Sequence, residues 1–113
     1  MQMHVDGVCT VMVHVPLPAQ GLAWYEQAFS NAIRQRIEGQ AFEYLQVGDV
    51  RIEVVNTDQK VASGPAGTVV YWKVENITQA LAHLQSLGAK LYRGPMAIED
   101  THSMCQVQDP WGN

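Results

Sequence analysis

The chain has 113 residues, of which 47% are apolar and 16% charged, with a formal net charge of −4 and a pI near 5.4. This length supports one hydrophobic core, and the composition is that of a globular protein rather than a disordered one. Because the chain is acidic and its Lys and Arg residues are scattered, we expect neither nucleic acid nor a membrane surface as a partner.

The sequence carries no marks of a membrane or secreted protein. No apolar run approaches the roughly 20 residues that span a bilayer, and the first residues lack the charge and apolar stretch of a secretion signal. The cysteines, Cys9 and Cys105, form neither a disulfide framework nor a CxxC motif. We therefore expect a cytoplasmic protein.

The first half of the chain predicts a strand, a helix and three further strands. Residues 10–15 alternate and are rich in β-branched side chains, and Pro16 and Pro18 end that strand. The spacing of Leu22, Tyr25 and Phe29 predicts a helix within residues 17–30. Short strand-like segments separated by glycine turns follow, at residues 32–38, 42–47 and 51–56.

The second half begins after a turn-rich segment, residues 58–67, which we interpret as a linker. Residues 68–74 predict a strand, and Asn76 is the expected N-cap of a helix that ends at Gly88. Two more strands are expected at residues 90–93 and 103–108, followed by a type I turn at residues 109–112.

The two halves share the same order of elements and align at an offset that places Thr10 on Thr68 and Phe29 on Leu87. We expect one α+β domain of two β-α-β-β-β modules, at about residues 8–57 and 68–113. The second module reaches Asn113 one strand short of the first, so we expect a further C-terminal segment to supply that last strand.

Several segments resemble the vicinal oxygen chelate superfamily, which includes glyoxalase I, extradiol dioxygenases and bleomycin resistance proteins. The resemblance rests on residues 22–29, 74–77 and 87–90, and on the closing Gln-Asp-Pro-Trp-Gly-Asn of residues 108–113. It implies two modules that form a curved mixed sheet, or cup, with a small-molecule site inside it. It also implies a homodimer, since a second chain often completes that site.

In metal-dependent members of this superfamily, the ligands lie on the first and last strands of each module. Carried over by position, they fall on Thr10, Glu53 and Thr68, with the fourth beyond Asn113. Of these only Glu53 is a usual metal ligand, because a neutral threonine hydroxyl binds zinc, iron or nickel poorly. We therefore expect no cofactor, with a divalent metal at Glu53 as the alternative.

Strand alternation groups the candidate binding residues. His14 shares a face with Thr10 and Met12, and Arg51 shares one with Glu53. By the same alternation Trp72 shares a face with Thr68, whereas Cys105 is more typical of a small buried side chain. The predicted ligand-binding set is Thr10, Met12, His14, Arg51, Glu53, Thr68 and Trp72.

Two interpretations of the charged residues stay open. In one, Glu53 is a general base assisted by His14, or it holds a cationic group of a ligand. In the other, Glu53 and Arg51 form a solvated pair near a rim, and His14 is a hydrogen-bonded core residue.

Three classes of function are compatible with the sequence. The first is a metal-free protein of the bleomycin-resistance kind that binds a small organic molecule in the cup. The second is a metal-dependent lyase, isomerase or dioxygenase of the glyoxalase I type that uses Glu53. The third is a non-catalytic structural or interaction module.

Overall fold

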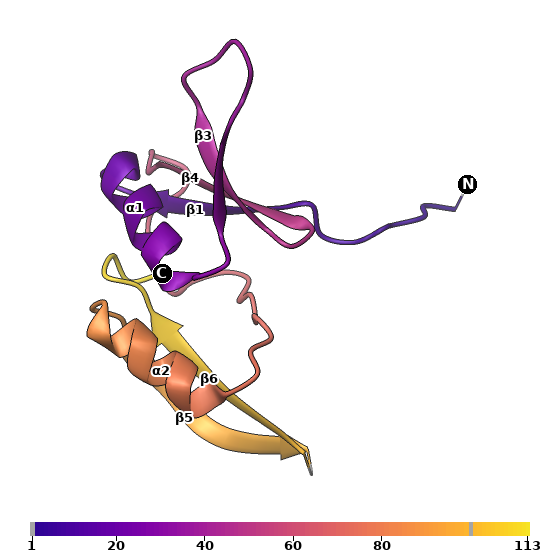
Figure 1. The fold of residues 1–113 in the computed structure, drawn as a ribbon, viewed down its shortest axis with the longest axis vertical. Helices are drawn as coiled ribbons and strands as arrows, with labels where there is room; N and C mark the ends of the chain where they lie inside the picture. The colour runs from indigo at the N-terminus through magenta and orange to yellow at the C-terminus, as the bar shows by residue number, and fades with distance from the viewer. Residues whose placement is uncertain (1, 100) are drawn as a thin grey trace. The chain divides into compact units, whose positions relative to one another are not determined.

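A computed structural model describes residues 2–99 and 101–113 of the chain (Figure 1). The chain divides into two compact units, Met1–Thr57 and Asp58–Asn113, which are described separately below. Within the described residues, no helix is both long and apolar enough to cross a membrane.

The first unit is a mixed four-stranded sheet with one helix against it. Strand β1 pairs in parallel with β4, β4 pairs antiparallel with β3, and β3 pairs antiparallel with β2, so the order is β1-β4-β3-β2. Helix α1 follows β1 and contacts β1, β3 and β4 (Figure 1). The bounds are β1 Thr10–Val15, α1 Pro18–Ala28, β2 Ile33–Arg36, β3 Glu43–Val47 and β4 Val50–Asn56.

These bounds confirm all five elements predicted for this half. The first strand has the expected limits, whereas the helix is shorter than residues 17–30 at both ends. Its start follows from Pro18, because a proline is favoured in a first helical turn, where its missing N–H leaves no bond unmade. The strand pairing of the β2–β3 hairpin covers Ile33 to Arg36, and beyond it the backbone N–H of Ile37 donates to the carbonyl oxygen of Phe42 at 3.0 Å.

The core of the first unit lies between α1 and the sheet. Leu45, Ile52 and Val15 are at most 1% exposed, and Leu22 of α1 and Val54 of β4 are also buried. Gly21 lets the helix approach this closely: a Cβ there would lie 2.7 Å from Cγ1 of Val54 and 2.8 Å from Cγ2 of Val15. Neither valine can move freely, because both belong to paired strands.

We predict that Gly21→Ala destabilises the protein by about 1–3 kcal/mol, although alanine is the better helix former, because the added methyl overpacks the contact with Val15 and Val54. Urea unfolding measures the change. The matched control is Gln20→Ala, an exposed position on the same helix, which we expect to change stability by less than about 0.5 kcal/mol. A stabilised Gly21→Ala protein would contradict this account of the packing.

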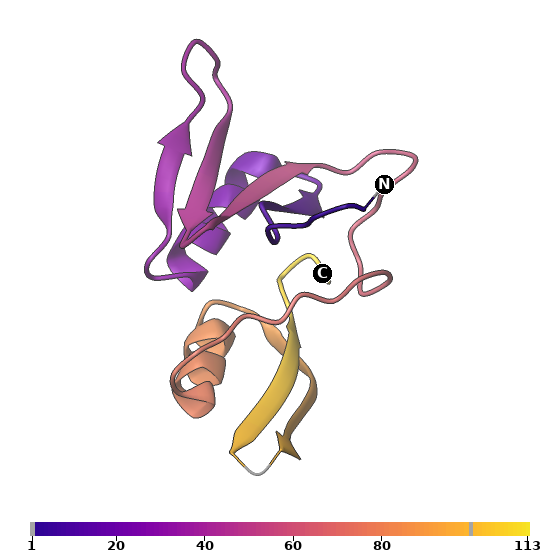
Figure 2. The ribbon, with the colours of Figure 1, turned by 90° about the vertical axis from the view of Figure 1, so that its right-hand side faces the viewer.

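The second unit consists of one helix against a two-stranded antiparallel ribbon. Figure 2 shows helix α2 along the ribbon, and α2 contacts both strands. As predicted, Asn76 caps the helix, with its side-chain oxygen accepting a hydrogen bond of 2.9 Å from the backbone N–H of Gln79. Gly88 follows the helix at a φ of 98°, which favours glycine. The bounds are α2 Ile77–Ser86, β5 Lys90–Glu99 and β6 His102–Gln108.

Strand β5 is longer than the predicted residues 90–93. Gly94 and Pro95 favour a break, but the register shift between Arg93 and Met96 accommodates both residues, and pairing resumes at Met96 with Met104. Gly94 is tightly placed, since a Cβ there would lie 2.8 Å from the carbonyl oxygen of Met104. The prediction from composition therefore placed the end of β5 too early in the chain.

The strand predicted at residues 68–74 is wrong: the structure has no regular element there. Val69, Val70, Tyr71 and Val74 of this segment are 44–56% exposed. The first unit explains the difference, because β1 has its hydrogen-bonded neighbour in β4, the fourth strand of that module. The described part of the second unit holds only β5 and β6 as strands, so residues 68–74 lack the corresponding neighbour.

The turn expected at residues 109–112 is present, and Asp109 organises it. The backbone N–H of Gly112 donates to the carbonyl oxygen of Asp109 at 3.0 Å. The Asp109 carboxylate is buried and accepts hydrogen bonds from the backbone N–H groups of Trp111 and Asn113, both at 2.9 Å, and from the Asn113 side chain at 3.0 Å. A buried carboxylate is tolerated here because its oxygens are hydrogen-bonded.

We predict that Asp109→Ala lowers the free energy of unfolding by about 2–4 kcal/mol, since it removes these charge-assisted hydrogen bonds. Asp109→Asn keeps one acceptor oxygen and is expected to cost less. The control is Asp49→Ala in the exposed turn between β3 and β4, with an expected change below about 0.5 kcal/mol. Equal urea midpoints for Asp109→Ala and Asp49→Ala would show that the turn does not depend on the carboxylate.

Candidate functional site

The sheet of the first unit has two chemically different faces. Val15 and Val54 face α1, as their contacts at Gly21 show. Because successive residues of a strand point to opposite faces, Thr10, Met12 and His14 of β1 face away from the helix. We call this side, turned away from α1, the distal face.

Strand pairing brings the predicted residues of β1 and β4 together on the distal face. In the parallel register Thr10 is opposite Arg51 and Met12 is opposite Glu53, while His14 is opposite Val55. The sequence prediction that these side chains share one face therefore agrees with the register. Their role in binding stays a prediction.

Arg51 is held by an aromatic ring and a carboxylate. Its guanidinium carbon lies 3.7 Å from the centroid of the Tyr44 ring. Its Nη1 donates to Oε2 of Glu53 at 3.4 Å. The side chains of Arg51 and Glu53 are 34% and 17% exposed, so the pair is partly buried rather than fully solvated.

The site predicted from the sequence does not include Tyr44. Its place follows from the antiparallel register of β3 and β4, in which Gln46 is opposite Arg51 and Tyr44 lies two residues further along the same face. The signal that could have identified it is the alternation of β3 combined with the short Gly48-Asp49 turn, which constrains the register of the hairpin.

Thr68 and Trp72, also predicted for the site, belong to the second unit. Both lie in the segment that forms no strand; Thr68 is exposed and Trp72 is half-buried. The prediction that they share a face assumed that residues 68–74 form a strand. Because the segment forms none, that assumption is wrong.

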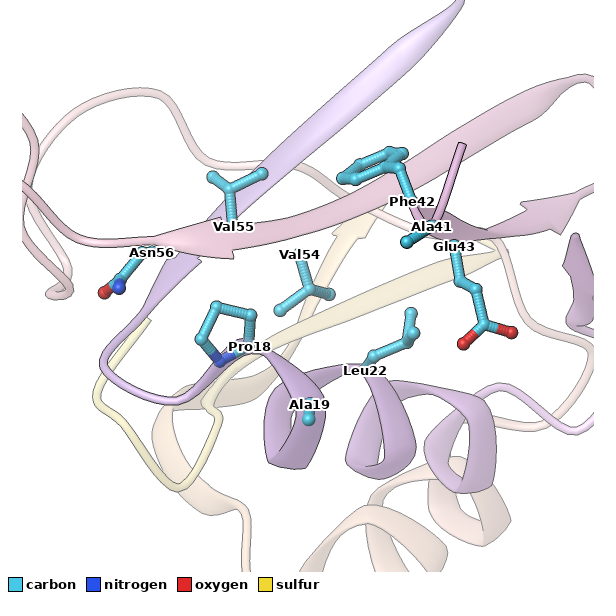
Figure 3. Close-up of a pocket in the computed structure, with 9 residues that line it drawn as sticks. All are labelled: Pro18, Ala19, Leu22, Ala41, Phe42, Glu43, Val54, Val55 and Asn56. Atoms are coloured by element: carbon cyan, nitrogen blue, oxygen red, sulfur yellow. The ribbon is translucent and has the colours of Figure 1, made fainter. Parts of the chain in front are cut away.

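A pocket of about 380 Å³ lies in the first unit where α1 packs near the end of β4 (Figure 3). Val54, Leu22 and Pro18 contribute to an apolar lining, and Glu43 is its charged side chain. Figure 3 shows Val54 and Val55 projecting to opposite sides of β4. None of the predicted site residues lines this pocket, and none of its lining residues was predicted as functional.

A family model described as the Glyoxalase/Bleomycin resistance protein/Dioxygenase superfamily matches residues 7–113 of the chain. The chain belongs to this superfamily. The match spans both units and includes Thr10, Glu53 and the closing turn at residues 109–112, so it confirms the resemblance inferred from the sequence.

Solved structures of the same fold agree. An integron cassette protein from the mobile metagenome of V. cholerae has a TM-score of 0.74 at 17% identity, covering 100% of this chain and 94% of that one. A glyoxalase/bleomycin resistance protein/dioxygenase family enzyme from Burkholderia phytofirmans PsJN has a TM-score of 0.69 at 17% identity, with coverages of 89% and 88%.

TnmS3, an antibiotic binding protein from Streptomyces sp. CB03234, has a TM-score of 0.63 at 19% identity, covering 99% of this chain and 93% of that one. At these identities the likeness shows the fold, which is of the α+β class as predicted. No curated protein matches the sequence significantly.

The residues at the superfamily's metal-ligand positions in the first unit fit a divalent metal poorly. Thr10 offers a neutral hydroxyl, and Arg51 lies opposite it with its positive guanidinium 3.4 Å from the Glu53 carboxylate. A second cation at Glu53 would be repelled by that guanidinium. Among the described residues no three His, Cys, Asp or Glu side chains form a group that could hold a metal ion.

We predict a coupling energy of about 0.5–1 kcal/mol between Arg51 and Tyr44, because a guanidinium over an aromatic ring gains that much at a partly exposed site. A double-mutant cycle with Arg51→Gln and Tyr44→Leu, followed by urea unfolding, measures it. The control cycle pairs Tyr44→Leu with Arg34→Gln. Arg34 is equally exposed, at 33%, but pairs with Glu26 of α1 on the opposite face, so its coupling to Tyr44 should be near zero. Equal values in both cycles would contradict a specific stack.

Proposed function

We propose that this protein binds a small organic molecule on the distal face of its first unit and does so without a metal ion. The observation that carries the proposal is the cluster of Arg51, Tyr44 and Glu53, in which a charged pair is positioned by an aromatic ring on a sheet face that α1 does not cover. The neighbouring side chains on this face suit a ligand that has both an apolar part and a polar group.

The distal face places apolar side chains, such as Met12 and the Tyr44 ring, beside polar and charged groups, and ligand sites generally combine both kinds. Met12 is 52% exposed and lies opposite Glu53, so its flexible thioether is available as an adaptable apolar contact. His14 and Thr10 add polar groups at either side of Met12 on the same strand. A ligand with an apolar body and one polar group matches this arrangement.

The fold supports the same class of function. TnmS3, which shares the fold, is described as an antibiotic binding protein. Since that likeness extends only to the fold, it supports the binding of some organic molecule rather than a particular antibiotic. The general-base role considered for Glu53 is less favoured than binding, because Arg51 already donates a hydrogen bond to its carboxylate.

The test is a thermal-shift screen of organic molecules on chelator-treated protein. A molecule present at about 100 times its Kd stabilises the folded protein by roughly 2.7 kcal/mol, which raises Tm by about 10 °C for a chain of this size. We expect such ligands to lose their effect on Arg51→Gln and to keep it on Arg34→Gln, the matched arginine of the opposite face.

Metal dependence is measured in the same preparation. We expect substoichiometric nickel, zinc, iron and manganese by elemental mass spectrometry before chelation, and the same ligand-induced shift after it. Stoichiometric metal that is lost in Glu53→Gln and retained in Glu26→Gln would overturn the metal-free proposal and favour a metal-dependent lyase, isomerase or dioxygenase. Glu26 is a suitable control because its carboxylate also pairs with an arginine, on the helix side of the sheet.

A further inference from the structure

We propose that the ligand of the distal face is an organic acid and that Arg51 binds its carboxylate. This inference rests on the proposed function and names the chemical class of the ligand. It follows from the way in which the Arg51 guanidinium is held, from its exposure and from the charges around it.

The guanidinium is positioned but keeps donors for a ligand. Tyr44 covers one of its flat faces, which leaves the edges that carry the N–H groups uncovered by the ring. A guanidinium has five N–H donors, and the hydrogen bond to Glu53 uses one of them. At 3.4 Å that bond is longer than the roughly 2.7–2.9 Å of a strong charge-assisted one, so Glu53 orients Arg51 without saturating it.

The exposure of the two charged side chains also favours an anionic ligand. Arg51 is 34% exposed and Glu53 only 17%, so an approaching molecule meets the cation more readily than the carboxylate. Glu53 is the only acidic residue among the strand positions of the first unit that face away from α1. Among these strand positions a ligand carboxylate therefore meets one like charge, and that charge is already paired with Arg51.

The residues opposite Arg51 on the two neighbouring strands do not compete for the N–H groups of its guanidinium. Thr10 is opposite Arg51 on β1 and carries a hydroxyl that can donate to a carboxylate oxygen. On the other side, Gln46 is opposite Arg51 on β3, and its amide donates to the carbonyl oxygen of Gly48 at 2.8 Å. Gln46 is thus engaged by the turn instead of competing for the guanidinium.

The opposite assignment, a cationic ligand held by Glu53, is weaker. The Glu53 carboxylate is the more covered of the pair, and any cation that reached it would lie beside the Arg51 guanidinium. Two like charges at such a distance repel each other. A carboxylate on Arg51 instead adds a second anion to a cation with unused donors, which is the arrangement that arginine supports best.

The experiment is an NMR titration of the isotope-labelled full chain with benzoate, benzamide and benzylamine. These probes share one ring and differ in the head group, which is anionic, neutral or cationic. We expect benzoate in the millimolar range to cause saturable shifts of the Arg51 Nε–Hε signal and of the backbone amides of Met12 and Tyr44. Benzamide and benzylamine should bind at least about tenfold more weakly, because benzamide carries no charge and the ammonium of benzylamine is repelled by Arg51.

Variants separate a bidentate contact from simple charge attraction. Arg51→Lys keeps the positive charge but loses the planar fork, and we expect it to weaken benzoate binding about tenfold. Arg34→Gln should leave the benzoate affinity unchanged, because that arginine belongs to the helix side of the sheet. The spectrum of each variant shows whether it is folded before the titration begins.

The outcomes distinguish the two proposals. If benzylamine or benzamide shifts the distal-face signals and benzoate does not, the organic-acid inference is wrong while small-molecule binding at this face stands. If benzoate binds Arg51→Lys as tightly as the wild type, the guanidinium fork is not the contact and the inference is also wrong. If none of the three probes shifts a distal-face signal, both proposals fail at this face.

Discussion

The parallel pairing of β1 with β4 is the constraint on which the rest of the first unit depends. Parallel strands cannot be joined by a tight turn, so the chain between them must cross over, and here it does so as α1 followed by β2 and β3. The crossover places α1 against one face of the sheet, where Gly21 admits Val15 and Val54. The other face is left to side chains that the core does not need, and Thr10, His14, Arg51 and Glu53 lie there.

The second unit shows what the same sequence pattern does without that pairing. Residues 68–74 have the β-branched and aromatic composition of a strand, as residues 10–15 do, yet they form none. A strand in a sheet is stabilised by backbone hydrogen bonds to a neighbour and by packing of one face, so composition cannot replace a partner. In the described residues of this unit, β6 pairs with β5. The unit has no strand there that corresponds to β4, which is the strand that pairs with β1 in the first unit.

Local signals were enough for most of the helices and strands, while the binding role of the predicted site residues stays a prediction. Alternation grouped Thr10, Met12 and His14 within β1 and Arg51 with Glu53 within β4, and the Asn76 cap and Gly88 marked the ends of α2. What sequence periodicity does not contain is the register between strands. The contact of Tyr44 with Arg51, the continuation of β5 past Gly94 and the missing strand at residues 68–74 all depend on which backbone lies alongside, and each was missed for that reason.

Arg51 also sets the chemical surroundings of Glu53. A divalent metal offers open coordination positions and polarises the oxygens bound to it, whereas a guanidinium offers N–H donors in one plane. The geometry of Arg51, with Tyr44 on its flat side and Glu53 at one edge, leaves directional N–H donors at this point of the sheet. Donors of this kind would select a ligand by the shape and charge of its head group. The proposed binding of a planar anion would use the N–H donors of Arg51 that the bond to Glu53 leaves over.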